Sequence, residues 1–168
     1  LPIWFPGGLD VELLHPECKL VMNAGDGGPA GLDSSFDALF LLGLHAKQGT
    51  PAAPQAHMLF PGLEWNGETV GEIGMTVATA AVLGVPLVFI SGDRAAVREA
   101  QAFVPTIENV VTKEPLFSHA ANVFDPAPLL SLAPEKARLL IHAGAKRALQ
   151  RLPEISLPPQ PPFNPLEE

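Results

Sequence analysis

Four short apolar runs along the chain are each bounded by glycine, proline or charged residues. They occupy residues 19–22, 37–43, 86–90 and 107–112. Apolar runs of this length between turn residues are typical of strands buried within a sheet rather than of helices. We therefore predict a strand at each run, with a loop over residues 23–35 between the first two.

Two further short segments flank an Asn66-Gly67 dipeptide, namely residues 63–65 and 68–70. Asparagine and glycine tolerate the positive φ angles that a two-residue hairpin turn requires. This pattern predicts a β-hairpin.

Helical periodicity marks three other stretches. Residues 72–83 are mostly small and apolar and end before Gly84, which predicts a helix that can lie close to a sheet. A second helix follows Asp93, which occupies an N-cap position. Its polar side chains Arg98, Glu99 and Gln101 fall on one face, and its apolar side chains fall on the other. A third helix is predicted over about residues 134–152, with Pro134 in its first turn.

Alternation of strands and helices is the main evidence for the fold class. It predicts an α/β domain with a largely parallel sheet flanked by helices, in addition to the hairpin. We assign residues 1–152 to one such domain. Residues 153–168 contain six prolines, which cannot donate to a β-ladder, and they are predicted to form a Pro-rich tail or linker.

Composition and charge narrow the range of functions. Eighteen acidic and ten basic side chains give a net charge of -8, which repels nucleic acid and anionic membrane surfaces. The longest apolar stretches are far shorter than the roughly 20 residues of a membrane-spanning helix, so we predict no membrane segment. The single cysteine, Cys18, cannot form an internal disulfide, which favours the cytoplasm, and we expect it to be buried.

Candidate chemistry is concentrated between residues 45 and 72. His45 follows a predicted strand and Glu72 begins a predicted helix, while His57 lies between them. Two imidazoles and a carboxylate are ligands that zinc accepts, and zinc lowers the pKa of bound water. The spacing alone is unspecific, because a loop histidine and a carboxylate at a helix N-terminus are also expected without any metal.

The order of residues around these three side chains resembles a known family. The run at residues 42–51 (LGLHAKQGTP) is followed by Ala56-His57, by Asn66-Gly67 and by residues 71–74 (GEIG). This combination is similar to the zinc-dependent D-aminopeptidases of bacterial dipeptide-transport operons, and the resemblance extends from about residue 15 to residue 152. It includes residues 91–93 (SGD) and 111–114 (VTKE).

The resemblance implies a zinc-dependent aminopeptidase that removes an N-terminal D-amino acid from short peptides. By the same resemblance, His45 and Glu72 match ligands of a two-zinc centre, and His57 matches an active-site histidine that is not a ligand. Lys113 matches a lysine that lines the substrate cleft, although a solvated lysine is equally expected there. The family resemblance also implies rings of identical subunits.

Two motifs of the family pattern lie outside the resemblance. In the family, a strand carrying Asp-x-Glu and a strand ending in Asn-Asp-x-His supply the remaining ligands, and this sequence resembles the family only from about residue 15 onward, after both of them. Since the sequence opens Leu-Pro-Ile-Trp without an initiator methionine, we expect a fragment or processed product whose missing ligands lie in a companion segment. The alternative is a non-catalytic binding or assembly protein that keeps the fold with an incomplete metal site.

A glycine-rich stretch at residues 25–30 (GDGGPA) fits the G-x-G-x-x-A pattern of dinucleotide-binding loops. Pro29 removes an amide donor there, and the next apolar run follows too soon for a phosphate-binding helix. We interpret this stretch as a surface loop.

Overall fold

The computed structural model describes part of the chain. The described residues are 11–19, 21, 29–54, 63–65, 67–116, 128–155 and 157. The chain divides into two compact units, Leu1–Gly31 and Leu32–Glu168. Among the described residues of the first unit there is one short 3-10 helix, η2 (Val11–Leu13), whereas the sheets and α-helices belong to the second unit.

The second unit is built on a four-stranded sheet with the order β1-β4-β5-β6. Strands β1 (Leu39–Leu44), β4 (Leu87–Asp93) and β5 (Glu108–Pro115) are parallel, and β6 (Leu129–Ser131) runs antiparallel to β5. All seven residues of β4 are buried, as expected for a central parallel strand that is covered on both faces. The largely parallel sheet predicted from the sequence is therefore confirmed.

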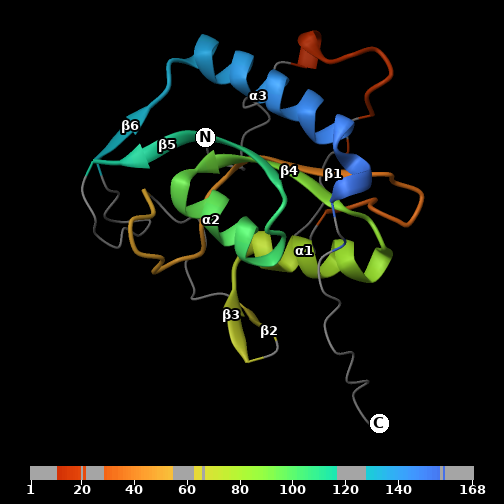
Figure 1. Cartoon of the computed structure of the whole chain (residues 1–168), viewed down its shortest axis with the longest axis horizontal. Coiled ribbons are helices and arrows are strands. Elements are labelled where there is room, and N and C mark those ends of the chain that lie inside the picture. The colour runs from red at the N-terminus through yellow and green to blue at the C-terminus, as the bar shows by residue number, and fades with distance from the viewer. Residues whose placement is uncertain are drawn as a thin grey trace. The chain divides into compact units, whose positions relative to one another are not determined.

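Helices cover both faces of this sheet (Figure 1). Helix α2 (Arg94–Phe103) packs against β4 and β5 with α1 (Glu72–Leu83) beside it, and α3 (Pro134–Gln150) packs against the same two strands from the other face. The α/β class and the flanking helices are thus confirmed. None of the helices in the described ranges is long and apolar enough to cross a membrane.

The predicted hairpin is also present. Strand β2 (Leu63–Trp65) pairs antiparallel with β3 (Glu68–Val70), and Trp65 lies opposite Glu68 so that two residues form the turn. Gly67 has a φ of +79°, which is the conformation for which a glycine was expected. The hairpin leads directly into α1, whose start carries Glu72.

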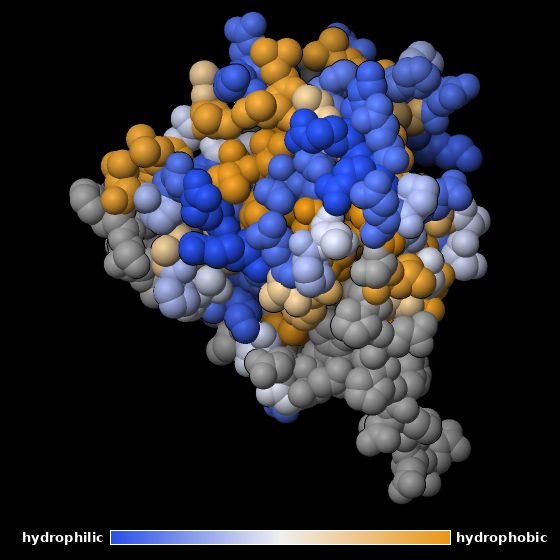
Figure 2. Space-filling view, in the orientation of Figure 1, coloured by the Kyte–Doolittle hydropathy of each residue, from blue (hydrophilic) through white to orange (hydrophobic). Residues whose placement is uncertain are grey.

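Close packing of α3 on the sheet depends on one glycine. A Cβ atom at Gly144 would lie 2.7 Å from the Phe89 ring and 2.9 Å from a Val110 methyl group. The core around this contact is large and apolar, with Phe89 and Ile90 fully buried. Elsewhere α3 and β6 leave apolar side chains at the surface, and Figure 2 shows hydrophobic residues in that region, where Leu130 and Leu139 are 58% and 64% exposed.

Two predictions near the N-terminus were wrong. Lys19 and Val21, from the run predicted as the first strand, lie outside any helix or strand, and Val21 is 59% exposed. A four-residue apolar run forms a strand only where a neighbouring ladder accepts its backbone groups, and these two residues have no such pairing. Cys18 is exposed rather than buried.

The C-terminal half also differs in detail from the prediction. Helix α3 ends at Gln150, and residues Leu152–Glu154 form a 3-10 turn, η3. Ile155 follows and is buried in the core, so the start of the segment assigned to the tail is folded. Strand β6 was not predicted. Residues 158–168 of the predicted tail and residues 25–28 of the glycine-rich stretch lie outside the described residues.

Candidate functional site

Candidate site residues meet at the carboxyl edge of the parallel strands. His45 directly follows β1, and Leu44 at the end of that strand is paired with Gly92. Asp93 ends β4 and is paired with Lys113 on β5. Because carboxyl ends of parallel strands share one edge, side chains from distant parts of the sequence are brought together here.

The end of β1 is shaped by residues of the Ser91-Gly92-Asp93 motif. Gly43 has a φ of +75°, and the β1–β4 register shifts between Leu42 and Leu44. The Gly43 amide donates to the buried Ser91 hydroxyl at 3.2 Å. A Cβ atom at Gly92 would lie 2.1 Å from the Leu44 carbonyl oxygen, so only glycine permits this approach. This local geometry fixes where the chain leaves β1 and where His45 begins.

His45 and Glu72 converge as expected from the sequence. His45 Nε2 lies 3.5 Å from Glu72 Oε1, and both side chains are largely shielded from solvent. Glu72 is the first residue of α1, where a carboxylate is favoured by the helix dipole. The preceding residue, Gly71, lets the start of α1 lie close to the chain after His45, because a Cβ atom at Gly71 would lie only 2.7 Å from Lys47 Cβ.

The imidazole of His45 is oriented by the backbone. Its Nδ1 lies 3.0 Å from the Ala46 carbonyl oxygen. A carbonyl oxygen can only accept, so this contact favours the tautomer with the proton on Nδ1, whereas the Glu72 carboxylate beside Nε2 favours the other tautomer. The neutral ring satisfies one of these two acceptors and the protonated ring satisfies both. Burial lowers the pKa of His45, but the interactions with Glu72 and with the Ala46 carbonyl outweigh burial and leave the pKa raised.

Two more carboxylates stand near His45, and both come from the β4–α2 segment. Asp93 caps α2 by accepting the amides of Ala95 and Ala96 at 2.8 and 2.9 Å. Glu99 accepts the Lys47 amide at 2.8 Å. Burial raises the pKa of each carboxyl, and the amide hydrogen bonds that each accepts oppose the rise only in part. The predicted N-cap role of Asp93 is confirmed, but Glu99 is not the solvated residue that the helix pattern indicated.

Donor type and spacing of the His45–Glu72 pair suit zinc. Two ligand atoms bound to one tetrahedral zinc ion at usual bond lengths stand about 3.3–3.6 Å apart. The observed separation of 3.5 Å falls in this range. Two ligands are fewer than the three or four protein ligands of a usual zinc site. In the described part of the chain, no group of three or more histidine, cysteine, aspartate or glutamate residues is arranged to hold a metal.

The other predicted site residues are less well defined. His57 lies outside the described residues, so its position relative to His45 stays a prediction. Lys113 is exposed on β5 at the same edge of the sheet. A role for Lys113 in a substrate cleft also stays a prediction.

Comparison with known proteins now places this site in a family. Residues 8–167 match the family model described as D-aminopeptidase. This chain belongs to the D-aminopeptidase family. It is 33% identical over 134 residues to the D-aminopeptidase of Bacillus subtilis (strain 168), across 76% of this chain and 48% of that protein.

A solved structure shares the D-aminopeptidase fold. It is the Zn-dependent D-aminopeptidase DppA from Bacillus subtilis, described as a self-compartmentalizing protease. The TM-score is 0.73 at 30% identity, and the match covers 90% of this chain and 54% of that structure. The chain thus spans about half the length of the relatives that it matches.

Proposed function

We propose that this chain forms part of the active site of a zinc-dependent aminopeptidase that removes the N-terminal D-residue from short peptides. One observation carries the proposal: in a chain of the D-aminopeptidase family, the imidazole of His45 and the carboxylate of Glu72 lie 3.5 Å apart at the carboxyl edge of the sheet. Hydrolase, aminopeptidase and zinc-dependent activity are properties that the names of the relatives give to those proteins.

In this proposal, His45 and Glu72 hold zinc through Nε2 and a carboxylate oxygen. Zinc bound there would polarise the scissile carbonyl group and lower the pKa of water toward neutrality. His57 transfers a proton or stabilises the negative charge that develops on the carbonyl oxygen. Lys113 lines the cleft in which the peptide binds. The contact between His45 Nδ1 and the Ala46 carbonyl oxygen supports this part, since a ring with its proton on Nδ1 leaves Nε2 as the coordinating atom.

A complete site with two zinc ions needs more ligands than the described residues provide. We propose that a companion segment supplies them, consistent with the chain spanning about half the length of its relatives. We also propose that identical subunits assemble, because the solved relative is described as a self-compartmentalizing protease. A chamber enclosed by subunits would admit short peptides and keep larger proteins out, which fits the proposed substrate.

The test combines metal analysis with hydrolysis. The complete enzyme, which includes the companion segment, is loaded with zinc, and release of D-alanine from a D-alanyl dipeptide is compared with release of L-alanine from its L-isomer. We expect zinc-dependent activity on the D-isomer that is lost on chelation and restored by zinc. Tight zinc binding with no hydrolysis of either isomer would contradict the proposed reaction.

One observation favours a second candidate, a non-catalytic binding or assembly protein. No group of three metal-binding side chains occurs within the described residues, and Asp93 and Glu99, the two other carboxylates that interact with His45, are engaged by backbone amides. For such a protein we expect weak zinc binding, no hydrolysis, and an oligomer of unchanged size when zinc is removed. Size-exclusion chromatography with light scattering, with and without a chelator, distinguishes the two candidates.

A further inference from the structure

A single peptide group connects Glu99 to His45. The peptide between Ala46 and Lys47 accepts from His45 Nδ1 through its carbonyl oxygen, at 3.0 Å. The same peptide donates to Glu99 Oε2 through its amide, at 2.8 Å. A peptide bond is planar and rigid, so fixing the direction of its N–H also fixes the direction of its C=O. Glu99 and His45 therefore lie on opposite ends of one rigid unit.

Burying the Glu99 carboxylate beside the Lys47 amide has an energetic cost, which indicates that this hydrogen bond has a role. Glu99 belongs to the face of α2 on which Arg98 is exposed, yet its own carboxylate is partly buried. Burial disfavours its ionised form, and the amide and ammonium of Lys47 compensate only in part. A carboxylate in this setting strengthens the hydrogen bond from an amide and polarises the peptide, which makes the carbonyl oxygen a better acceptor.

We propose that Glu99 is a positioning residue that sets the tautomer and direction of the His45 imidazole through the Ala46–Lys47 peptide. In many metal sites a carboxylate bonds directly to the second nitrogen of a histidine ligand. Here the carboxylate acts one peptide group further away. The consequence for zinc binding rests on the proposed function, whereas the effect on the tautomer of His45 does not.

Three variants separate the explanations. Glu99→Met removes the acceptor and preserves much of the side-chain volume. Glu99→Asp keeps the charge but shortens the reach. Glu99→Gln keeps an acceptor oxygen at the original length without the charge. Arg98→Ala, on the exposed face of the same helix, is the matched control.

The first readout is the metal-free chain with ¹⁵N-labelled histidine, observed by NMR at a pH above the pKa of the ring. Assignment uses His45→Ala. In the original chain and in Arg98→Ala we expect ¹⁵N shifts of a ring protonated at Nδ1. In Glu99→Met and Glu99→Asp we expect shifts averaged toward the Nε2-protonated form. Glu99→Gln should restore the original tautomer, which a merely destabilised fold would not do.

The second readout is zinc affinity by competition with a chelator. Glu99→Met should raise the dissociation constant by about 10–100-fold, with Glu99→Gln within a few-fold of the original chain. If Glu99→Met does not fold, Glu99→Asp carries both measurements. An unchanged His45 tautomer in the folded variants overturns the proposal. A tautomer that responds while every variant keeps the zinc affinity of the original chain supports the positioning role and contradicts the role of His45 as a zinc ligand instead.

Discussion

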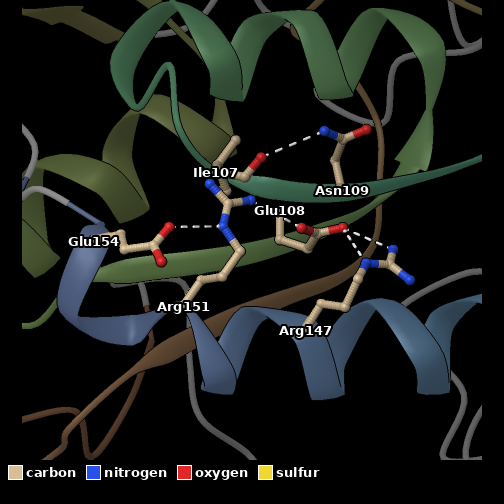
Figure 3. A network of polar contacts seen from close by, with 6 residues as sticks. All are labelled: Ile107, Glu108, Asn109, Arg147, Arg151 and Glu154. Atoms are coloured by element: carbon tan, nitrogen blue, oxygen red, sulfur yellow. Dashed lines mark hydrogen bonds and ion pairs between the residues drawn. The ribbon is translucent and has the colours of Figure 1, made fainter.

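Charged side chains at the two ends of the parallel sheet are neutralised in different ways. At the amino end of β5, Glu108 bonds Arg147 at 2.7 Å and Arg151 at 3.1 Å, and Arg151 also bonds Glu154 (Figure 3). At the carboxyl end, Asp93 and Glu99 accept hydrogen bonds from backbone amides. Arginines hold the acid at the amino end, whereas the backbone holds the two acids near His45, although an exposed Arg94–Glu114 pair also lies at the carboxyl end.

The contacts at the amino end contribute to the stability of the fold, whereas those at the carboxyl end position the backbone near His45. The arginines at the amino end are 40–50% exposed, although their partner Glu108 is only 14% exposed, and water and salt screen an ion pair whose cation is solvated. A carboxylate held by amides determines the path of the chain that it binds. At the carboxyl end that path includes Ala46 and Lys47, the two residues directly after His45. We therefore expect substitutions at the carboxyl end to affect the site and substitutions at the amino end to affect only stability.

The largest expected effect is the loss of activity on removing a site residue. His45→Ala and Glu72→Ala should lose zinc and hydrolysis together, because each removes a ligand. His57→Ala should reduce hydrolysis by roughly 10²–10⁴-fold with zinc largely retained, because a proton-transfer or oxyanion group affects the rate alone. Elemental analysis and D-alanine release check this in the complete enzyme. Equal zinc loss in the His57 and His45 variants would make His57 a ligand.

A methyl group at Gly92 should have the next largest effect. Gly92→Ala places a carbon atom against the Leu44 carbonyl oxygen, where no flexible side chain can yield. We expect a loss in free energy of unfolding of about 3 kcal/mol or more, measured by urea denaturation. Gly84→Ala is a useful comparison, since no atom lies within 4 Å of its Cβ and its cost is confined to the positive φ of +72°. Equal losses in both variants would show that Gly92 is not tightly packed.

Removal of the α2 cap should have an intermediate effect. Asp93→Ala removes the acceptor of two helix amides and should cost about 0.5–2 kcal/mol, while Asp93→Asn retains a good cap and should cost less. If Asp93 also holds the backbone after His45, zinc affinity should fall in Asp93→Ala more than in Asp93→Asn. A loss of stability without any change in zinc affinity would confine Asp93 to the capping role.

The smallest effect is predicted at the amino end. Arg147→Ala should lower the free energy of unfolding by only about 0.2–1 kcal/mol and leave zinc affinity unchanged, because its side chain is half exposed. The difference in free energy of unfolding should shrink in 0.5 M salt, because the Debye length falls there to about 4 Å and the charges are screened. A double-mutant cycle with Glu108→Gln measures the pair itself. A change in zinc affinity here would break the distinction between the two ends.

Sequence patterns predicted the helices and the hairpin more closely than the strand ends. Glu72–Leu83 is the predicted range of the first helix, because small apolar residues and Gly84 delimit it unambiguously. Strand β4, by contrast, continues three residues beyond Ile90. Ser91 and Gly92 have the local preferences of a turn, and their pairing with β1 on one side and β5 on the other explains why they remain extended and buried.

The site, like the fold, was predicted in part, and the part that was missed depends on contacts between distant segments. Convergence of His45 and Glu72 was expected, although from the family resemblance rather than from their spacing. Glu99 was missed because its position in an amphipathic helix predicts a solvated side chain. Its partner, the Lys47 amide, lies 52 residues earlier, and backbone amides leave no trace in a sequence. Side-chain partners can be guessed from residue types, whereas backbone partners depend on the fold.

The β2–β3 hairpin is mechanically coupled to His45. Lys47 Nζ donates to the Thr69 carbonyl oxygen on β3, and the Lys47 backbone is pressed against Gly71 at the base of the hairpin. A force applied at the tip near Gly67 is therefore transmitted along two short strands to the residue after Ala46. A ligand that displaced the hairpin would therefore also shift the Lys47 backbone, which belongs to the same peptide group as the carbonyl oxygen that His45 Nδ1 contacts.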